Sequence, residues 1–149
     1  MKKITAGVFI INKDNKILVC HPTNHSQNFW SISKGAVEDG EILIDAAIRE
    51  TFEETNIDLK GVSGLKTLKF VEYKNGKKSL HAFLCWEPAV SGLDWYGFDL
   101  KCNSFVPIEK GGFPEMDDYK WVTLSEAREI MHEAQVKILD EIEEIIGKV

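Results

Sequence analysis

One segment of the chain, residues 35–57, constrains its fold more than any other. From about Ile42 to Thr55 the apolar residues recur at a helical period, which predicts an amphipathic helix. Glu50, Glu53 and Glu54 stand at positions i, i+3 and i+4 of this helix, so their side chains share one face. A solvated helix face usually has lysine among its acidic residues, and this face has none. The segment therefore predicts a helix with a concentrated negative face.

Three neighbouring carboxylates repel one another, and each like-charge pair costs an exposed helix about 0.2–0.5 kcal/mol. A bound cation would remove that cost. Hard divalent cations such as Mg²⁺ prefer carboxylate, carbonyl and water oxygens, and they also bind substrate phosphates. The acidic face therefore favours metal-assisted attack of water on a phosphoanhydride. From the three carboxylates alone, an acidic helix face that only meets solvent remains the alternative.

Residues just before the helix add to this interpretation. Gly35 predicts a turn in which the backbone can approach the site closely and offer a carbonyl oxygen to the metal. Lys34 beside it is a candidate phosphate contact, with a solvated lysine as the alternative. Glu41 and Arg49 carry opposite charges and can pair, which would tie the turn to the helix.

The complete spacing resembles the Nudix box. That pattern has a glycine, a glutamate after five residues and Arg-Glu after seven more, followed by Glu-Glu and a closing aliphatic residue. The matching positions are Gly35, Glu41, Arg49, Glu50, Glu53, Glu54 and Ile57. Thr51 departs from it, standing in place of an aliphatic residue, and Asn56 replaces the glycine that ends the helix. Asparagine is the next-best residue for the left-handed conformation of a helix end, so the helix is expected to end there. With Trp30 upstream and the run from Phe113 to Val122 downstream, the resemblance covers most of the chain.

The resemblance implies a single domain over residues 1–149 with an α/β fold, a Nudix-type α/β/α sandwich around a mixed β-sheet. It implies a hydrolase that cleaves a phosphoanhydride bond in a nucleoside-diphosphate-linked substrate, with Mg²⁺ as cofactor and Mn²⁺ as a second candidate. By the same resemblance the metal ligands are Glu50, Glu53 and Glu54, with Gly35 beside them, and the catalytic residues are Glu53, Glu50 and Arg49. Which residue acts as the general base stays open, because in this family the base is not always on the helix.

Substrate choice depends on residues outside the box. The segment from Trp30 to Gly35 looks like the Trp…Pro-Lys-Gly opening of diadenosine polyphosphate hydrolases, with Ser33 where proline is usual. Tyr73 lies close to where those enzymes carry an adenine-stacking tyrosine, and such stacking contributes roughly 1–3 kcal/mol. A strand-end aromatic residue is the alternative for Tyr73. A dinucleoside polyphosphate such as diadenosine tetraphosphate is therefore the expected substrate.

Three other functions stay open. A nucleoside triphosphate pyrophosphatase and an RNA 5′-end pyrophosphohydrolase would use the same chemistry on other substrates. A non-catalytic nucleotide-sensing module would keep the fold but would be expected to lose box carboxylates, and Glu50, Glu53 and Glu54 are all present. The enzyme is favoured over the sensing module for that reason.

The overall charge limits the partners. The chain has 24 acidic against 18 basic side chains and a formal net charge of −6. Sequence-independent binding to nucleic acid or to an anionic membrane needs clustered positive charge, so long nucleic acids and membranes are not expected partners. No apolar run approaches the length of a membrane span, and a cytoplasmic location is expected. The oligomeric state is not predicted.

The remaining sequence predicts strands alternating with polar turns and two further helices. Strands are expected over Ile4–Ile11, Ile17–Cys20, Leu65–Tyr73, Ser79–Trp86 and Tyr119–Leu124, with a hairpin turn at Asn75–Gly76. Ser125 is the predicted N-cap of a helix that runs through His132, and Ala134–Ile146 forms a final amphipathic helix. Ala89–Pro114 is expected to be an insertion or long loop. The aromatic residues around it could line a base pocket, although packing in the core or anchoring of the loop is favoured; they are Trp86, Trp95, Tyr96 and Phe98.

Overall fold

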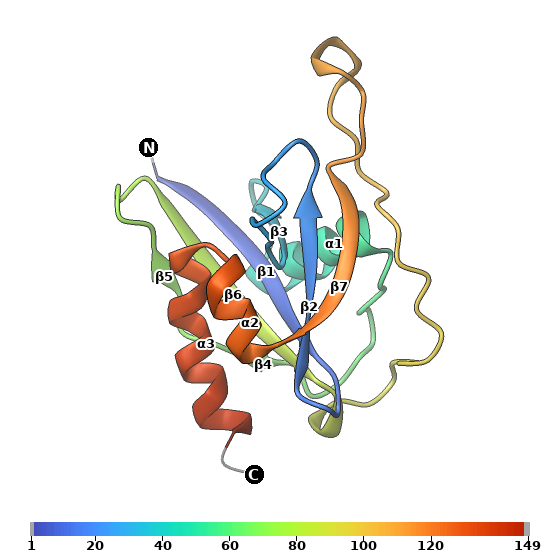
Figure 1. Ribbon diagram of the computed structural model, residues 1–149, viewed down its shortest axis with the longest axis vertical. Coiled ribbons are helices and arrows are strands. Elements are labelled where there is room, and N and C mark those ends of the chain that lie inside the picture. Colours follow the sequence, from blue (N-terminus) through green and yellow to red (C-terminus); the bar gives the residue numbers. More distant parts are fainter. Residues whose placement is uncertain (1, 148–149) are drawn as a thin grey trace.

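A mixed β-sheet with helices on both faces forms the centre of the computed structural model, which describes residues 2–147 (Figure 1). The strands are β1 (Lys3–Ile11), β2 (Lys16–Pro22), β3 (Ser33–Ala36), β4 (Lys66–Thr67), β5 (Val71–Glu72), β6 (Lys78–Trp86) and β7 (Met116–Thr123). The α-helices are α1 (Leu43–Thr55), α2 (Leu124–Ile130) and α3 (Glu133–Ile146). None of the helices in the described part of the chain combines the length and the apolar character needed to cross a membrane.

Strand β1 organises the sheet, whose main order is β4-β6-β1-β2-β7. It pairs in parallel with β6 along one edge. On its other edge the first half pairs antiparallel with β3, from Thr5–Ala36 to Val8–Ser33, and the end pairs antiparallel with β2. Strand β3 therefore lies beside the start of β1, and this places the segment before α1 at one end of the sheet.

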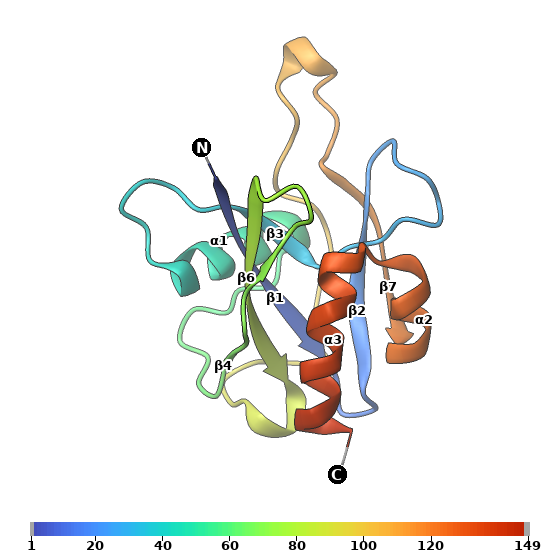
Figure 2. The same cartoon turned by 90° about the vertical axis from the view of Figure 1, so that its left-hand side faces the viewer.

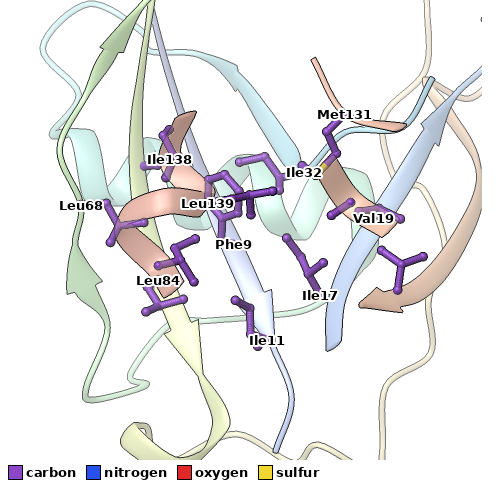
Figure 3. Close-up of a cluster of buried hydrophobic side chains, with 14 of the residues drawn as sticks. Phe9, Ile11, Ile17, Val19, Ile32, Leu68, Leu84, Met131, Ile138 and Leu139 are labelled. Carbon is purple, nitrogen blue, oxygen red and sulfur yellow. The ribbon is translucent and has the colours of Figure 1, made fainter. Parts of the chain in front are cut away.

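Alternation along β1 divides the core into two layers. Phe9 and Ile11 point toward α2 and α3, where they pack with Ile138 and Leu139 (Figure 3). Val8 and the other residues of opposite parity point toward α1. Because side chains of a strand alternate between the two faces of a sheet, one strand contributes to both layers. The two layers confirm the predicted α/β/α sandwich, which Figures 1 and 2 show with α1 and α3 on opposite faces.

Three predictions of local structure were wrong. Gly35 does not lie in a turn but within β3, where it pairs with Ala6. The local sequence pattern did not indicate this strand because its partner, β1, is remote in sequence. The predicted strand Leu65–Tyr73 is broken into β4 and β5, which pair separately with β6. In contrast, the predicted hairpin turn at Asn75–Gly76 is confirmed, with Gly76 at φ 68°.

The third concerns the start of α2, which Thr123 caps instead of Ser125. The Thr123 hydroxyl accepts a hydrogen bond from the Glu126 backbone N–H at 3.1 Å, and the Glu126 carboxylate accepts one from the Thr123 N–H at 3.3 Å. This reciprocal capping box satisfies two backbone donors, which Ser125, inside the first turn, does not do. The helix ends at Ile130, and His132 caps α3 by accepting a hydrogen bond from the Ala134 N–H.

The predicted insertion Ala89–Pro114 is a long excursion between β6 and β7. Its regular structure in the described residues is limited to short 3-10 turns at Glu87–Ala89 and Ile108–Lys110. Its second half leaves the sheet as two extended arms, with the Ile108–Lys110 turn at the far tip (Figure 1). Trp95 and Phe98 pack against the α1-side core, so the anchoring of the loop is confirmed for these two residues.

Candidate active site

Hydrogen bonds hold the C-terminal end of helix α1 in place, whereas its N-terminal end has no side-chain cap. Asn56 adopts the left-handed conformation, φ 67° and ψ 13°, and its N–H donates to Phe52 O at 2.9 Å, which confirms the predicted helix end. Its side chain also donates to Asp99 O and accepts from Asn103, both in the excursion. The start of the helix has no side-chain cap at Ile42, as the sequence indicated. The helix is therefore held where it meets the excursion.

Arg49 gathers the acidic side chains of the box. It forms the predicted pair with Glu41, in which Nε donates to Oε2 at 2.9 Å and Nη2 to Oε1 at 3.0 Å. It also donates to Glu50 Oε2 at 2.7 Å, to Glu53 Oε2 at 3.1 Å and to the Ala36 carbonyl at 2.9 Å. The guanidinium holds the pKa of Glu41 down at about 2. One cation thus fixes the β3–α1 connection and two of the three helix carboxylates.

Gly35 lets the Glu50 carboxylate lie directly against strand β3. A Cβ atom at position 35 would collide with all three carboxylate atoms of Glu50. Glu50 is nearly buried, and burial raises its pKa, against the opposing hydrogen bond from Arg49. The close backbone approach predicted for Gly35 is therefore present, although in a strand.

Glu54 is the most deeply buried of the three carboxylates, with 4% of its surface exposed. One of its oxygens accepts a hydrogen bond from the Lys34 N–H at 3.0 Å. Burial, together with the negative charge of Glu50, raises the pKa of Glu54 to about 8. These effects outweigh the positive charge of Lys34, which acts in the opposite direction.

A cavity of about 700 Å³ opens over these carboxylates. Residues of the loop after β2 and of the second half of the excursion line it, together with the starts of β1 and β6. The lining residues used below are Lys3, Thr5, His25, Phe29, Lys34, Gly35, Glu50, Glu53, Glu54, Lys78, Phe113 and Glu115. The cavity therefore brings together residues of β1, the loop after β2, β3, α1, β6 and the excursion, which are far apart in the sequence.

Two cationic residues of this cavity were missed by the sequence analysis. Lys3 and Lys78 are register partners on β1 and β6, and both line the cavity with Lys34 of β3. Within the described residues none of the three lysines forms an ion pair with a carboxylate. Burial and the charges of Lys34 and Lys3 lower the pKa of Lys78 to about 8. Only the pairing of β1 with β6 and β3 reveals this cluster, which no local motif indicates.

A fourth carboxylate, Glu115, was also missed. It follows Phe113 and Pro114 at the base of the excursion and lines the cavity. Its negative charge contributes to the raised pKa values of both Glu50 and Glu54. The Phe-Pro-Glu run before the last strand was the available signal, but nothing local to it indicates which element it faces.

Tyr73 is not among the residues that line the cavity. Its half-buried ring packs against His132, with centroids 4.9 Å apart, and the Lys78 ammonium lies 4.9 Å from the Tyr73 centroid. It therefore lies next to a residue that lines the cavity, Lys78. The structure brings the other predicted site residues together around α1 and β3.

The donor set suits a hard divalent cation. Glu50, Glu53, Glu54 and Glu115 offer carboxylate oxygens, and the raised pKa values of Glu50 and Glu54 indicate negative charge that a cation would offset. Among residues 2–147, no three acidic, histidine or cysteine side chains already converge on one point as a metal cluster. Glu50 and Glu53 each accept a hydrogen bond from the Arg49 guanidinium instead.

Comparison with known proteins identifies the family. The NUDIX domain model matches residues 1–142, so the chain belongs to the Nudix family and is a Nudix pyrophosphohydrolase. The RNA pyrophosphohydrolase of Pelagibacter ubique is 26% identical over 147 residues, which cover 96% of this chain and 90% of the relative. The RNA pyrophosphohydrolase of Baumannia cicadellinicola is 31% identical over 123 residues, covering 78% and 74%. The crystal structure of the C. elegans Ap4A hydrolase superposes with a TM-score of 0.66 at 26% identity, covering 98% of this chain and 99% of that one.

Proposed function

We propose that this enzyme uses a divalent metal ion to cleave a phosphoanhydride bond inside the polyphosphate chain of a nucleotide. The observation that carries the proposal is the composition of one cavity, which is lined both by carboxylates of α1 and by three lysines that form no ion pair with a carboxylate in the described residues. Carboxylates bind a hard cation and lysines bind phosphate oxygens. A site that holds both groups is suited to metal-assisted hydrolysis of a polyphosphate.

Glu50, Glu53 and Glu54 would hold the metal, with Glu115 and the Gly35 carbonyl as further oxygen donors. Mg²⁺ is the proposed ion and Mn²⁺ the second candidate; when bound, the ion would polarise a phosphoryl oxygen and favour ionisation of a water. Arg49 keeps Glu50 and Glu53 in position through its hydrogen bonds. Glu115 reaches the cavity from outside the box, which makes it a candidate for the general base alongside Glu53.

Lys34, Lys78 and Lys3 would bind the phosphates. Three ammonium groups along one wall offer more positive charge than a single diphosphate needs, which favours a chain of three or more phosphates. The cavity also carries aromatic rings, since His25 and Phe29 stack with centroids 5.3 Å apart and Phe113 lies on the excursion side. These rings supply stacking surface for a base.

The proposed substrate is a dinucleoside polyphosphate such as diadenosine tetraphosphate. It combines a long phosphate chain with a base at each end, which matches the lysine wall and the aromatic rings. Similarity to the C. elegans Ap4A hydrolase over almost the whole chain supports this choice. Tyr73 could contribute to base stacking only at the edge of the cavity, beyond Lys78.

A triphosphorylated RNA 5′ end is the second candidate. Two observations favour it: the relatives described above are named RNA pyrophosphohydrolases, and the same lysine wall fits a 5′-triphosphate. The net charge of −6 disfavours extended contact with an RNA backbone, but binding of the 5′ end needs only the local lysines. A sensing module without activity is disfavoured because all box carboxylates are present.

A product-resolved hydrolysis screen tests the proposal. The enzyme with Mg²⁺ is given diadenosine tetraphosphate, a triphosphorylated RNA, ATP and ADP-ribose at equal concentration, and the products are separated. Conversion of diadenosine tetraphosphate to ATP and AMP with the highest kcat/KM supports the first candidate, and release of pyrophosphate from RNA with the highest kcat/KM supports the second. Preference for ADP-ribose would contradict the requirement for a long phosphate chain.

A further inference from the structure

We propose that a second cavity, at the opposite end of the sheet, binds a nucleobase that presents N–H donors. This site goes beyond the proposed function because it does not involve the catalytic residues. The cavity has a volume of about 320 Å³, within the range of small-molecule sites. Its lining comes from the β1–β2 turn, the end of β6, the excursion and β7; the residues used below are Lys13, Asp14, Glu87, Trp95, Tyr96, Phe98 and Trp121.

The two cavities are separated by most of the length of β1. Thr5, near the start of the strand, lines the catalytic cavity, and Asn12, just after its end, lines the second one. Seven residues of extended strand span about 23 Å at the usual rise of ~3.3 Å per residue. The two cavities share no lining residue among those described, so they are distinct.

Tyr96 is the most exposed aromatic residue that lines this cavity. It is 82% exposed, whereas Trp95 and Phe98 beside it already pack against the core. Its ring is nevertheless held in place, because the Lys13 ammonium donates to the Tyr96 hydroxyl at 2.9 Å and lies 5.5 Å from the ring centroid. The Tyr96 N–H also donates to the Asp94 carboxylate at 3.1 Å. A large exposed ring that is fixed in advance loses little entropy on binding a flat ligand.

Behind Tyr96 the cavity has an aromatic wall. Trp95 and Phe98 lie with centroids 5.6 Å apart, and Phe98 and Trp121 lie 6.5 Å apart with planes only 10° from parallel. Rings from the excursion and from β7 therefore meet on one side of the cavity. Base–aromatic stacking tolerates any base and contributes roughly 1–3 kcal/mol for each base. The wall selects a planar ring.

The polar groups of the cavity determine which hydrogen-bonding groups the planar ligand must have. The Lys13 N–H donates to one oxygen of Glu87 at 2.8 Å, which orients the carboxylate. Across residues 2–147, the other Glu87 oxygen and the Asp14 carboxylate accept no hydrogen bond from a protein group. The one ammonium among the described lining residues, that of Lys13, already donates to the Tyr96 hydroxyl, and the two carboxylates accept hydrogen bonds, so the complementary ligand is uncharged and has N–H donors. Guanine fits best, because its ring N–H and amino group lie side by side and can donate to one carboxylate.

Guanosine, which has no phosphate, is the probe that isolates this site. It is titrated into the ¹⁵N-labelled full chain without metal, and the indole N–H resonances of the tryptophans are followed. The proposal predicts saturable shifts at Trp95 and Trp121. Trp30, in the loop between residues that line the catalytic cavity, reports on binding there. Shifts confined to Trp30, or no shift at any indole, would overturn the proposal.

Substitutions then test the assigned residues. Tyr96→Ala is expected to raise the Kd for guanosine about 5- to 140-fold, which is the fold-change equivalent of one lost base stack. Phe70→Ala removes another exposed ring, one outside the cavity, and Glu53→Gln alters the catalytic cavity; both should leave the Kd unchanged. Uridine, which has one ring N–H between two carbonyls, should bind more weakly than guanosine. An unchanged Kd for Tyr96→Ala, or equal affinity for uridine, would contradict the assignment.

Discussion

Ser33 donates a hydrogen bond from its hydroxyl to Thr51 Oγ1 at 3.3 Å, between β3 and α1, where both side chains are buried. Thr51 departs from the Nudix box, and Ser33 stands where the diadenosine polyphosphate hydrolases usually carry proline. Thr51 in turn donates to the Ala47 carbonyl at 2.8 Å. Buried hydroxyls need partners, and Thr51 supplies the acceptor that the Ser33 hydroxyl requires.

We therefore predict that these two positions are energetically coupled. Thr51→Val removes the acceptor and leaves the Ser33 hydroxyl buried without a partner, which costs about 1–3 kcal/mol. The double variant Ser33→Ala/Thr51→Val should be destabilised by less than the sum of the two single variants, with a coupling of at least about 0.5 kcal/mol. Urea unfolding of the four proteins measures this coupling. Strict additivity would show that the hydrogen bond contributes nothing.

A second prediction concerns the contact between Gly35 and Glu50. In Gly35→Ala the new methyl group displaces the Glu50 carboxylate, whose flexible side chain can move without disrupting β3. Binding of Mn²⁺ should weaken by about 10- to 100-fold, the usual effect of disturbing the surroundings of a metal ligand. Electron paramagnetic resonance of free Mn²⁺ measures the affinity, and the thermal unfolding midpoint checks the fold. Unchanged affinity in a folded variant would remove Glu50 from the metal site.

The three lysines that line the catalytic cavity, Lys3, Lys34 and Lys78, give a third prediction. Lys78→Ala should raise KM for a polyphosphate substrate by about 10-fold or more, since a hydrogen bond to a charged group contributes about 1.5–3 kcal/mol. Lys74→Ala is the matched control, because Lys74 is exposed on the same hairpin and pairs with Glu133 outside the cavity. Steady-state kinetics at two salt concentrations measure both variants. Equal KM values for the two variants would refute a phosphate-binding role for Lys78.

The Glu41–Arg49 pair predicts a specific acid sensitivity. The folded pKa of Glu41, about 2, lies below its ordinary value of 4.5. A depressed carboxyl pKa stabilises the fold above the unfolded pKa, and that contribution is lost as the pH falls toward the folded value. The difference in unfolding midpoint between wild type and Glu41→Gln should therefore narrow from pH 4.5 toward pH 2. A difference that is constant over this window would contradict the pairing.

The pKa of His21 is raised, so its contribution to stability changes with pH in the opposite direction. Burial lowers its pKa, but hydrogen bonds with Asp117 at 2.6 Å and the Ser26 carbonyl at 3.0 Å outweigh burial, so the net shift is upward. A raised histidine pKa stabilises the fold below pH 6.5, and this contribution is lost as the pH rises through the folded value. Asp117→Asn should lower the pKa of His21, as measured by NMR titration. An unchanged pKa of His21 in this variant would show that Asp117 does not cause the upward shift.

The sequence predicted those parts of the site that depend on neighbours in the chain. The shared face of Glu50, Glu53 and Glu54, the helix end at Asn56 and the pairing of Glu41 with Arg49 all follow from spacing within 23 residues. Local preferences determine such features, because helical geometry alone fixes which side chains meet.

The parts that were missed depend on strand pairing. Lys3 and Lys78 meet only because β1 and β6 run in parallel, and Gly35 lies in a strand only because Ala6 is its partner. Thr123 and Ser125 are both good cap residues, and the end of β7 decides between them. Long-range register of this kind carries no signal in a local pattern.

The central claim is that the carboxylate face of α1 hydrolyses a phosphoanhydride with the help of a divalent metal ion. The most direct test measures kcat for the best substrate of the screen with wild type, Glu53→Gln and Glu144→Gln, each in EDTA and after addition of Mg²⁺. Glu144 lies on α3, outside the catalytic cavity, and its variant should behave as wild type. We predict that Mg²⁺ restores wild type but leaves Glu53→Gln reduced by at least about 100-fold. Full activity of Glu53→Gln, or turnover by wild type in EDTA, would contradict the claim.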